Sequence, residues 1–145
     1  MGTPFQVTFD CASPGRLAEF WALALGYILQ PPPEGCASWQ EWLIARGVPE
    51  SDWDTISAIV DPDGDGPRIL FMRVPEPKTV KNRLHLDINA GGSLDTPSDE
   101  RRVRVDATVA RLRDAGATQV REAEDMHGAR WIVLRDPEGN EFCVQ

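Results

Sequence analysis

The polar side chains of two short alternating segments are the first candidates for chemistry in this sequence. Residues 5–10 and 83–89 each alternate between apolar and polar types. The polar positions of interest are Gln6, Thr8, His85 and Asp87. An imidazole titrates near neutral pH, so it can contact a ligand, transfer a proton or bind a metal ion. His85 is therefore the candidate catalytic residue, and the alternative is a structural imidazole bonded to Asp87 or Arg83.

A cysteine near the end of the chain adds a thiol to this set. Cys143 is a candidate nucleophile or soft metal ligand, since the thiolate does both. No histidine lies near it in the sequence, so we favour an inert thiol that lines a binding site. Cys11 and Cys36 are interpreted as bystanders. His127 lies in a polar loop and is expected at the surface, with a role in closing the site as the alternative.

Two similar halves must position these side chains. In the first half, a helix begins at Pro14 after the Ser13 cap and ends at Gly26. The strands of that half are predicted at residues 5–10, 27–30, 55–60 and 68–74. The second half repeats the order, with a helix at 99–115. Its strands are predicted at residues 83–89, 118–122, 130–134 and 141–144. Tight turns are expected at residues 61–66 and 136–139.

An insertion at residues 31–54 interrupts the first half. A capping box from Ser38 to Glu41 opens a short helix that ends at Gly47. Trp39 and Trp42 share one face of this helix. These two residues, with Trp53, either anchor the insertion to the main body or stack on a flat ligand.

The two halves also match residue by residue. Residues 6–10 align with 85–89, and Leu70 aligns with Cys143. The apolar residues of each first strand must face the helix of their half, so the polar ones face away. Those apolar residues are Phe5, Val7 and Phe9 in one half and Leu84, Leu86 and Ile88 in the other.

This pattern predicts an α+β fold of two βαβββ modules, residues 1–76 and 77–145, in a single domain. Their curved mixed sheet surrounds a cup, and the helices lie outside. Small ligands bind in such hollows. The expected ligand-binding residues are Gln6, Thr8, Leu70, Met72, His85, Asp87, Cys143, Trp39 and Trp42.

Composition excludes several classes of function. The 145 residues carry a formal net charge of −8, which disfavours nucleic-acid binding. No apolar run approaches a membrane span, and the first residues do not resemble a signal peptide. Three irregularly spaced cysteines indicate free thiols, so we expect a cytoplasmic protein.

Three stretches carry a family resemblance. They are residues 18–26 (AEFWALALG), 80–87 (VKNRLHLD) and 134–144 (LRDPEGNEFCV). In them the chain resembles the vicinal oxygen chelate superfamily, which includes glyoxalases, extradiol dioxygenases, and bleomycin and fosfomycin resistance proteins. The second stretch is similar to the glyoxalase-like subgroup. The resemblance implies a divalent metal in the cup, with its four ligand positions at Gln6, Leu70, His85 and Cys143.

That ligand set is incomplete, because a leucine side chain cannot coordinate a metal. We therefore expect a binder of a small organic molecule that lacks a complete metal site, and we expect a homodimer. The alternative is a metal-dependent lyase, isomerase or dioxygenase whose altered site uses Gln6 and His85 with Glu141 or Cys143. A non-catalytic interaction module is a third interpretation.

Overall fold

The chain divides into two compact units, Met1–Pro77 and Lys78–Gln145. The computed structural model describes residues 2–93, 95–126 and 128–145, and His127 lies outside them. A cup shared by the two modules stays a prediction. No helix among the described residues is long and apolar enough to cross a membrane.

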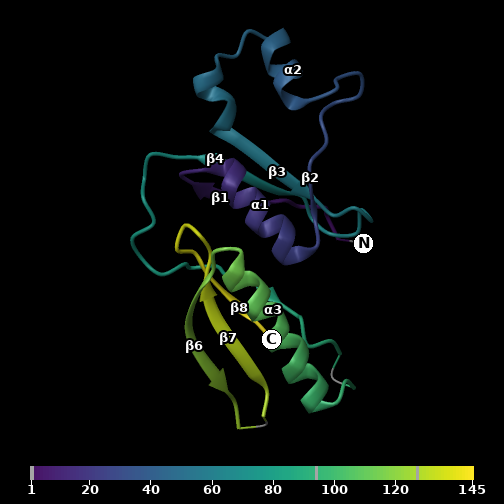
Figure 1. Ribbon diagram of the computed structural model, residues 1–145, viewed down its shortest axis with the longest axis vertical. Helices are drawn as coiled ribbons and strands as arrows, with labels where there is room; N and C mark the ends of the chain where they lie inside the picture. Colours follow the sequence, from purple (N-terminus) through teal and green to yellow (C-terminus); the bar gives the residue numbers. More distant parts are fainter. Residues whose placement is uncertain (1, 94, 127) are drawn as a thin grey trace. The chain divides into compact units, whose positions relative to one another are not determined.

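The first unit contains one four-stranded mixed sheet (Figure 1). Its strands are β1 (Val7–Cys11), β2 (Ile28–Leu29), β3 (Ile56–Val60) and β4 (Ile69–Arg73). Its helices are α1 (Pro14–Leu25), α2 (Trp39–Ala45) and the 3₁₀ helix η1 (Glu50–Thr55). The strand order is β1-β4-β3-β2, with β1 and β4 parallel and the other pairs antiparallel. Both α2 and η1 belong to the insertion, and η1 was not predicted from the sequence.

The second unit repeats this topology. Its helix is α3 (Ser98–Asp114). Its strands are β5 (Asp87–Ile88), β6 (Thr118–Glu124), β7 (Arg130–Arg135) and β8 (Glu141–Val144). The order is β5-β8-β7-β6, again with one parallel pair, β5 and β8, and two antiparallel pairs. The predicted fold class, α+β with two βαβββ modules and mixed sheets, is therefore confirmed.

Helix α1 covers one face of the first sheet because its apolar residues recur at helical spacing. Pro14 occupies its first turn, and Gly26 ends it in the left-handed conformation, at φ 72°. The Ser13 side chain does not cap the helix, although we expected it to. Trp21 is only 1% exposed and lies 5.2 Å from Phe9 between ring centroids. Such aromatic packing places the core of this unit between α1 and the sheet.

Helix α3 packs on the second sheet in the same way. Its buried residues are Val105, Val109 and Leu112, as the periodicity predicts. The buried residues of β7 and β8 are Ile132, Leu134, Phe142 and Val144. Because side chains alternate along a strand, the residues between them lie on the opposite face of the sheet. That opposite face carries the candidate site of this unit.

Two predicted strands are shorter than the alternation suggests. Phe5 and Leu84 are each 70% exposed and lie outside the strands, so the prediction that they face a helix is wrong. β1 begins only at Val7, where its pairing with Ile69 of β4 begins. β5 is reduced to two residues, Asp87 and Ile88.

Candidate functional site

The strand register places the aligned residues of the two halves at equivalent positions. Thr8 pairs with Leu70 between the parallel strands β1 and β4. Asp87 pairs with Cys143 between β5 and β8. The alignment of Leu70 with Cys143 is thus confirmed. In the second sheet the row continues through Val133 to Arg121, so four strands contribute to one line of side chains.

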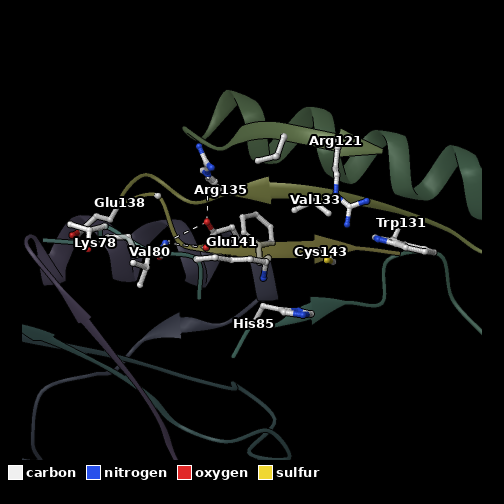
Figure 2. A pocket seen from close by; sticks show the side chains of 15 residues that line it. Lys78, Val80, His85, Arg121, Trp131, Val133, Arg135, Glu138, Glu141 and Cys143 are labelled. Carbon is white, nitrogen blue, oxygen red and sulfur yellow. Dashed lines mark hydrogen bonds and ion pairs between the residues drawn. The ribbon is translucent and has the colours of Figure 1, made fainter. Parts of the chain in front are cut away.

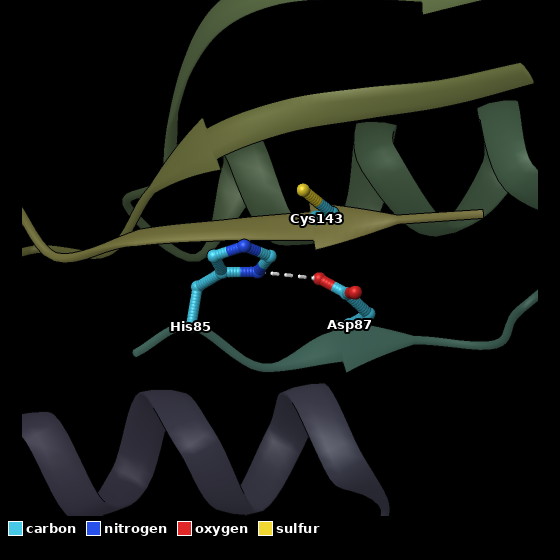
Figure 3. A group of neighbouring side chains, drawn as sticks. All are labelled: His85, Asp87 and Cys143. Carbon is cyan, nitrogen blue, oxygen red and sulfur yellow. Dashed lines mark hydrogen bonds and ion pairs between the residues drawn. The ribbon is translucent and has the colours of Figure 1, made fainter. Parts of the chain in front are cut away.

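Three side chains of the second unit gather on this face, away from α3 (Figure 3). The ligand atoms of His85, Asp87 and Cys143 all lie within 4.8 Å of one another. The His85 Nδ1 atom is 2.7 Å from Asp87 Oδ1, the geometry of a strong hydrogen bond. When Nδ1–H is donated to Asp87, the other ring nitrogen, Nε2, keeps its lone pair for a ligand. The structure therefore unites three residues that the sequence placed in the candidate site.

The Cys143 thiol is held in its protonated form. Burial raises its pKa, and so do the negative charge and hydrogen bonding of the neighbouring Asp87. Since the thiolate is the nucleophile, this environment opposes nucleophilic catalysis at neutral pH. It supports the interpretation of Cys143 as an inert lining thiol.

We expect Asp87→Asn to speed alkylation of Cys143 at pH 8 by about threefold to tenfold. The variant removes the negative charge that raises the thiol pKa, and one pKa unit changes the thiolate fraction about tenfold. Peptide mass spectrometry after timed iodoacetamide pulses measures the rate, with Cys36 of the same sample as the control. Identical Cys143 rates in the two proteins would contradict this assignment.

A pocket of about 550 Å³ surrounds His85 and Cys143 in the second unit (Figure 2). Pockets for small organic ligands span roughly 300–1,000 Å³. Trp131 and Val133 supply apolar wall from β7. The charged lining residues are Lys78, Lys81, Arg121, Arg135, Glu138 and Glu141. Four of these six are cationic, in a chain with a net charge of −8. The pocket thus concentrates positive charge on an acidic protein.

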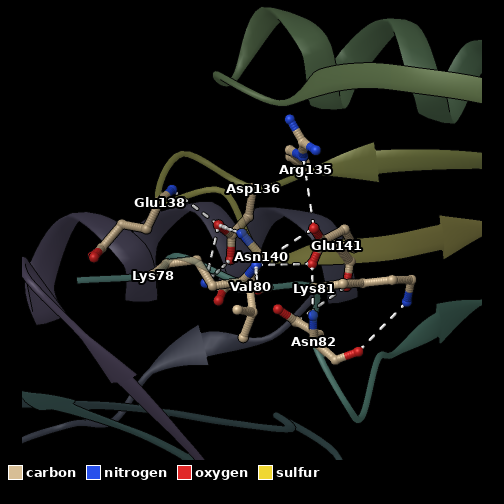
Figure 4. A network of polar contacts seen from close by, with 9 residues as sticks. All are labelled: Lys78, Val80, Lys81, Asn82, Arg135, Asp136, Glu138, Asn140 and Glu141. Carbon is tan, nitrogen blue, oxygen red and sulfur yellow. Dashed lines mark hydrogen bonds and ion pairs between the residues drawn. The ribbon is translucent and has the colours of Figure 1, made fainter. Parts of the chain in front are cut away.

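Glu141 lines this pocket and is bonded to neighbouring side-chain and backbone donors (Figure 4). Its Oε2 atom accepts the Asn82 backbone N–H at 3.0 Å and lies 3.1 Å from Lys78 Nζ. Arg135 Nε is 3.7 Å from the other oxygen. Burial raises the pKa of Glu141, but the hydrogen bonds from Asn82 and Lys78 and the charge of Lys78 outweigh it and lower the pKa to about 2.

Arg121 differs from the other pocket arginine in its partners. Arg135 lies beside Glu141, whereas Arg121 has no carboxylate within 4 Å in the described part of the chain. It stands next to Val133 in the row that ends at Asp87. An arginine without an acidic partner keeps its charge and its planar donors for a ligand.

The corresponding face of the first unit carries a different polar group. Arg68 donates from Nε to Gln30 Oε1 at 2.7 Å and from Nη1 to Gln6 Oε1 at 2.9 Å. Thr8 is exposed beside them, with 3.5 Å between its hydroxyl and the Gln6 amide nitrogen. Leu70 and Met72 follow on the same face of β4. Neither lines the pocket of this unit described below, and their role as an apolar wall of the cup stays a prediction.

The family's divalent metal does not fit the positions in this unit. Leu70 offers no donor atom. The Arg68 guanidinium donates to the very oxygen of Gln6 that would coordinate an ion, and its positive charge repels a cation there. Two of the four positions implied by the resemblance are therefore unsuited to a metal, for reasons that the residues themselves supply.

A second pocket, of about 490 Å³, lies in the first unit where the insertion meets the sheet. Trp39, Trp42 and Trp53 line it together with Arg68. No residue of α2 is buried, so the helix is not a core element of this unit. Both interpretations of the tryptophans, as anchors of the insertion or as an aromatic wall for a flat ligand, stay predictions.

Sequence reasoning missed the arginines and one tryptophan of these sites. Parity could have found Trp131, which alternates with the apolar core residues of β7. Arg68 precedes Leu70 by two residues, so it shares the face of Leu70. The segment Lys78–Asn82 has no regular structure, and no pattern in the sequence marks its place at the pocket.

Comparison with known proteins connects this geometry to a family. Residues 6–145 match the glyoxalase-like domain family. No curated protein matches the sequence. The chain is similar in fold to a glyoxalase/bleomycin resistance protein/dioxygenase family enzyme from Burkholderia phytofirmans PsJN, at 16% identity and a TM-score of 0.58. That match covers 96% of this chain and 94% of the other.

Two further solved structures share the fold. One is a mutant of the fosfomycin resistance protein FosX from Listeria monocytogenes, in complex with Mn(II) and 1S,2S-dihydroxypropylphosphonic acid. It has 12% identity and a TM-score of 0.62, and the match covers 100% of this chain and 92% of FosX. The other is a possible glyoxalase from Bacillus cereus, with 14% identity, a TM-score of 0.60, and coverage of 100% and 99%.

Proposed function

The chain belongs to the glyoxalase-like domain family, and we propose that it binds a small organic anion without a metal ion. The proposed site is the pocket of the second unit, around His85 and Cys143. One observation carries the proposal. The pocket has the volume of a small-molecule site and presents Arg121, which has no acidic partner among the described residues.

Different lining residues would contact different parts of the ligand. Arg121 and Lys81 attract the anionic group of the ligand, and the side chains of Trp131 and Val133 contact its apolar part. His85 Nε2 accepts a hydrogen bond from a ligand hydroxyl or amide, while Asp87 fixes the ring by its bond to Nδ1. The same Nε2 atom is placed to take a proton, should the bound molecule react.

The FosX complex supports the chemical class of the ligand. That protein holds a small organic phosphonate together with Mn(II). We propose that the present chain shares the preference for a small organic anion and differs in the metal. The difference rests on Leu70 and on the Arg68–Gln6 bond, which occupy two of the metal positions of the family.

A second candidate function follows from the cluster of His85, Asp87 and Cys143. One nitrogen, one oxygen and one sulfur donor within 4.8 Å form a set that suits zinc, and catalytic zinc has three protein ligands. A zinc-dependent lyase or isomerase would use this set in place of the family's four positions, whereas a dioxygenase would need a redox-active metal there.

The test is calorimetric titration of the purified protein with phenylphosphonate and, as its neutral analogue, benzyl alcohol. We expect saturable binding of the phosphonate that is unchanged after dialysis against EDTA. Arg121→Gln should weaken it at least tenfold, because a hydrogen bond to a charged group is lost. Arg113→Gln is the matched control, since this exposed arginine of α3 lies outside the pocket.

Two results would overturn the proposal. Binding that disappears with EDTA and returns with one equivalent of zinc would establish the second candidate instead. Equal affinities of the Arg121→Gln and Arg113→Gln variants for phenylphosphonate would show that the pocket is not an anion site.

A further inference from the structure

The insertion of the first unit builds a pocket that the proposed function does not use. Its aromatic lining consists of Trp39, Trp42 and Trp53, and its floor includes Ile56 and Ala58 of β3. All of these residues belong to Met1–Pro77. The pocket therefore forms within one unit, and its volume of about 490 Å³ admits a small organic molecule.

The indole rings are held in place by hydrogen bonds to the backbone. Trp39 Nε1 donates to the Gln30 carbonyl oxygen at 2.7 Å. Trp53 Nε1 donates to the Val48 carbonyl oxygen at 3.0 Å. With their N–H groups satisfied in this way, the rings present carbon surface to the pocket. Fixed aromatic surface is a good wall for a planar ring, since little side-chain freedom is lost on binding.

These tryptophans are only half-buried, unlike a core residue. Trp21 of α1 is fully buried, whereas Trp39, Trp42 and Trp53 all keep exposed surface. Trp39 meets Trp42 edge to face at 5.6 Å between centroids. Arg46 lies 3.8 Å above the Trp42 ring, so one face of that ring is already covered. All three rings line the pocket, so aromatic surface is available to a ligand there.

Arg68 gives the pocket a defined polar end. Its Nε and Nη1 atoms bond to two neutral glutamine side chains, and no carboxylate lies within 4 Å among the described residues. These two bonds fix the guanidinium plane and leave its charge uncompensated. The remaining nitrogen, Nη2, has no partner in the described part of the chain. A fixed guanidinium with an open donor edge recognises carboxylates and similar anions.

Two aspartates also line the pocket and limit where an anion can lie. Asp54 Oδ1 accepts the Gly15 backbone N–H at 2.8 Å, which ties the insertion to the start of α1. Asp52 accepts the Ser51 hydroxyl at 3.4 Å. Their charges repel a second anionic group. The lining therefore suits a molecule with one anionic end, at Arg68, and an uncharged ring.

We propose that this pocket is a separate binding site for a planar aromatic carboxylate. The ring of the ligand lies against the tryptophans of the insertion, and its carboxylate bonds to Arg68. This site is independent of the proposed anion site around His85, because the two pockets share no residue.

The experiment uses the indole N–H signals of the whole chain, labelled with ¹⁵N and titrated with 2-naphthoate or its neutral analogue 2-naphthamide. The five tryptophans give five signals, which single Trp→Phe variants assign. Trp39, Trp42 and Trp53 report on the proposed site, Trp131 on the pocket of the second unit, and buried Trp21 on folding.

We expect 2-naphthoate to shift the three insertion signals and to bind at least tenfold more tightly than 2-naphthamide. Arg68→Gln should weaken naphthoate binding at least tenfold and naphthamide binding less than twofold. Arg73→Gln, at the exposed end of β4, is the control for loss of one charge. In the unaltered protein, raising the salt concentration should weaken naphthoate binding more than naphthamide binding.

Three results would overturn the site. The first is a naphthoate shift confined to Trp131, which would leave only the pocket of the second unit. The second is equal affinity for the acid and the amide at all salt concentrations. The third is insertion signals that move with protein concentration and not with either probe, which would show that a second copy of the chain occupies the pocket.

Discussion

Replacing Asp136 by alanine should lower the free energy of unfolding of the second unit by about 3 kcal/mol. This carboxylate is 3% exposed and organises the turn between β7 and β8. Its oxygens accept the backbone N–H groups of Glu138 and Asn140, at 2.9 and 3.0 Å, and the Asn140 side chain. Alanine leaves these donors without an acceptor in a half-buried turn, and the cost of such groups is of this size. Hydrogen exchange of the β7 and β8 amides, measured at increasing urea concentrations, gives this free energy of unfolding.

The equivalent turn of the first unit supplies the control. Asp61 accepts only two backbone N–H groups, from Asp63 at 3.1 Å and Gly66 at 2.8 Å, and it is less buried than Asp136. Asp61→Ala should therefore cost about 1–2 kcal/mol, measured at the amides of β3 and β4. Equal losses in the two variants would show that the number of accepted bonds does not set the stability of these turns.

The order of helices and strands could be predicted because the same turn and helix-end signals occur in both halves of the sequence. The two turns just described begin with Asp-Pro in both halves, and the helices end at Gly26 and Gly116. Each of these signals is local and acts through backbone conformation, so it can be recognised without knowing the fold. The topology then follows, since each half must form the same sheet with one parallel pair.

The lengths of the first strands could not be predicted, because they depend on pairing. Leu84 fits the alternation as well as Ile88 does, yet only Ile88 has a ladder partner. The Asn82 backbone N–H bonds instead to the Glu141 carboxylate, from a residue 59 positions away. A pattern of apolar and polar residues contains no information about such a substitute for the ladder.

For the candidate site, the alternation of side chains along the strands predicted only which residues share a face. His85, Asp87 and Cys143 share a face because parity and register require it, and the structure brings them within 4.8 Å. The proposed chemistry of that face depends also on Arg121, which has no acidic partner among the described residues. Whether an arginine is neutralised by a carboxylate is decided by tertiary structure, so the proposed preference for an anion could not be predicted from the sequence.

Glu141→Gln should lower the free energy of unfolding by about 2 kcal/mol at pH 7 and by progressively less at acid pH. The side chain is 11% exposed and bonds to Asn82 and Lys78. Because its pKa is lowered to about 2, below the unfolded value near 4.3, its contribution is complete above pH 5 and disappears as the pH falls through 2.

Urea unfolding of both proteins at pH 7, 4 and 2.5 measures this effect, and Lys78→Met completes a double-mutant cycle with Glu141→Gln. A coupling energy of about 1 kcal/mol at pH 7 is expected from the 3.1 Å ion pair, and it should shrink at pH 2.5 as the carboxylate begins to protonate. If the free energies of unfolding of the unaltered protein and of Glu141→Gln differ by the same amount from pH 7 to 2.5, Glu141 stabilises the fold through its shape and not through its charge. The anchoring of Lys78–Asn82 at the pocket wall would then not depend on its charge.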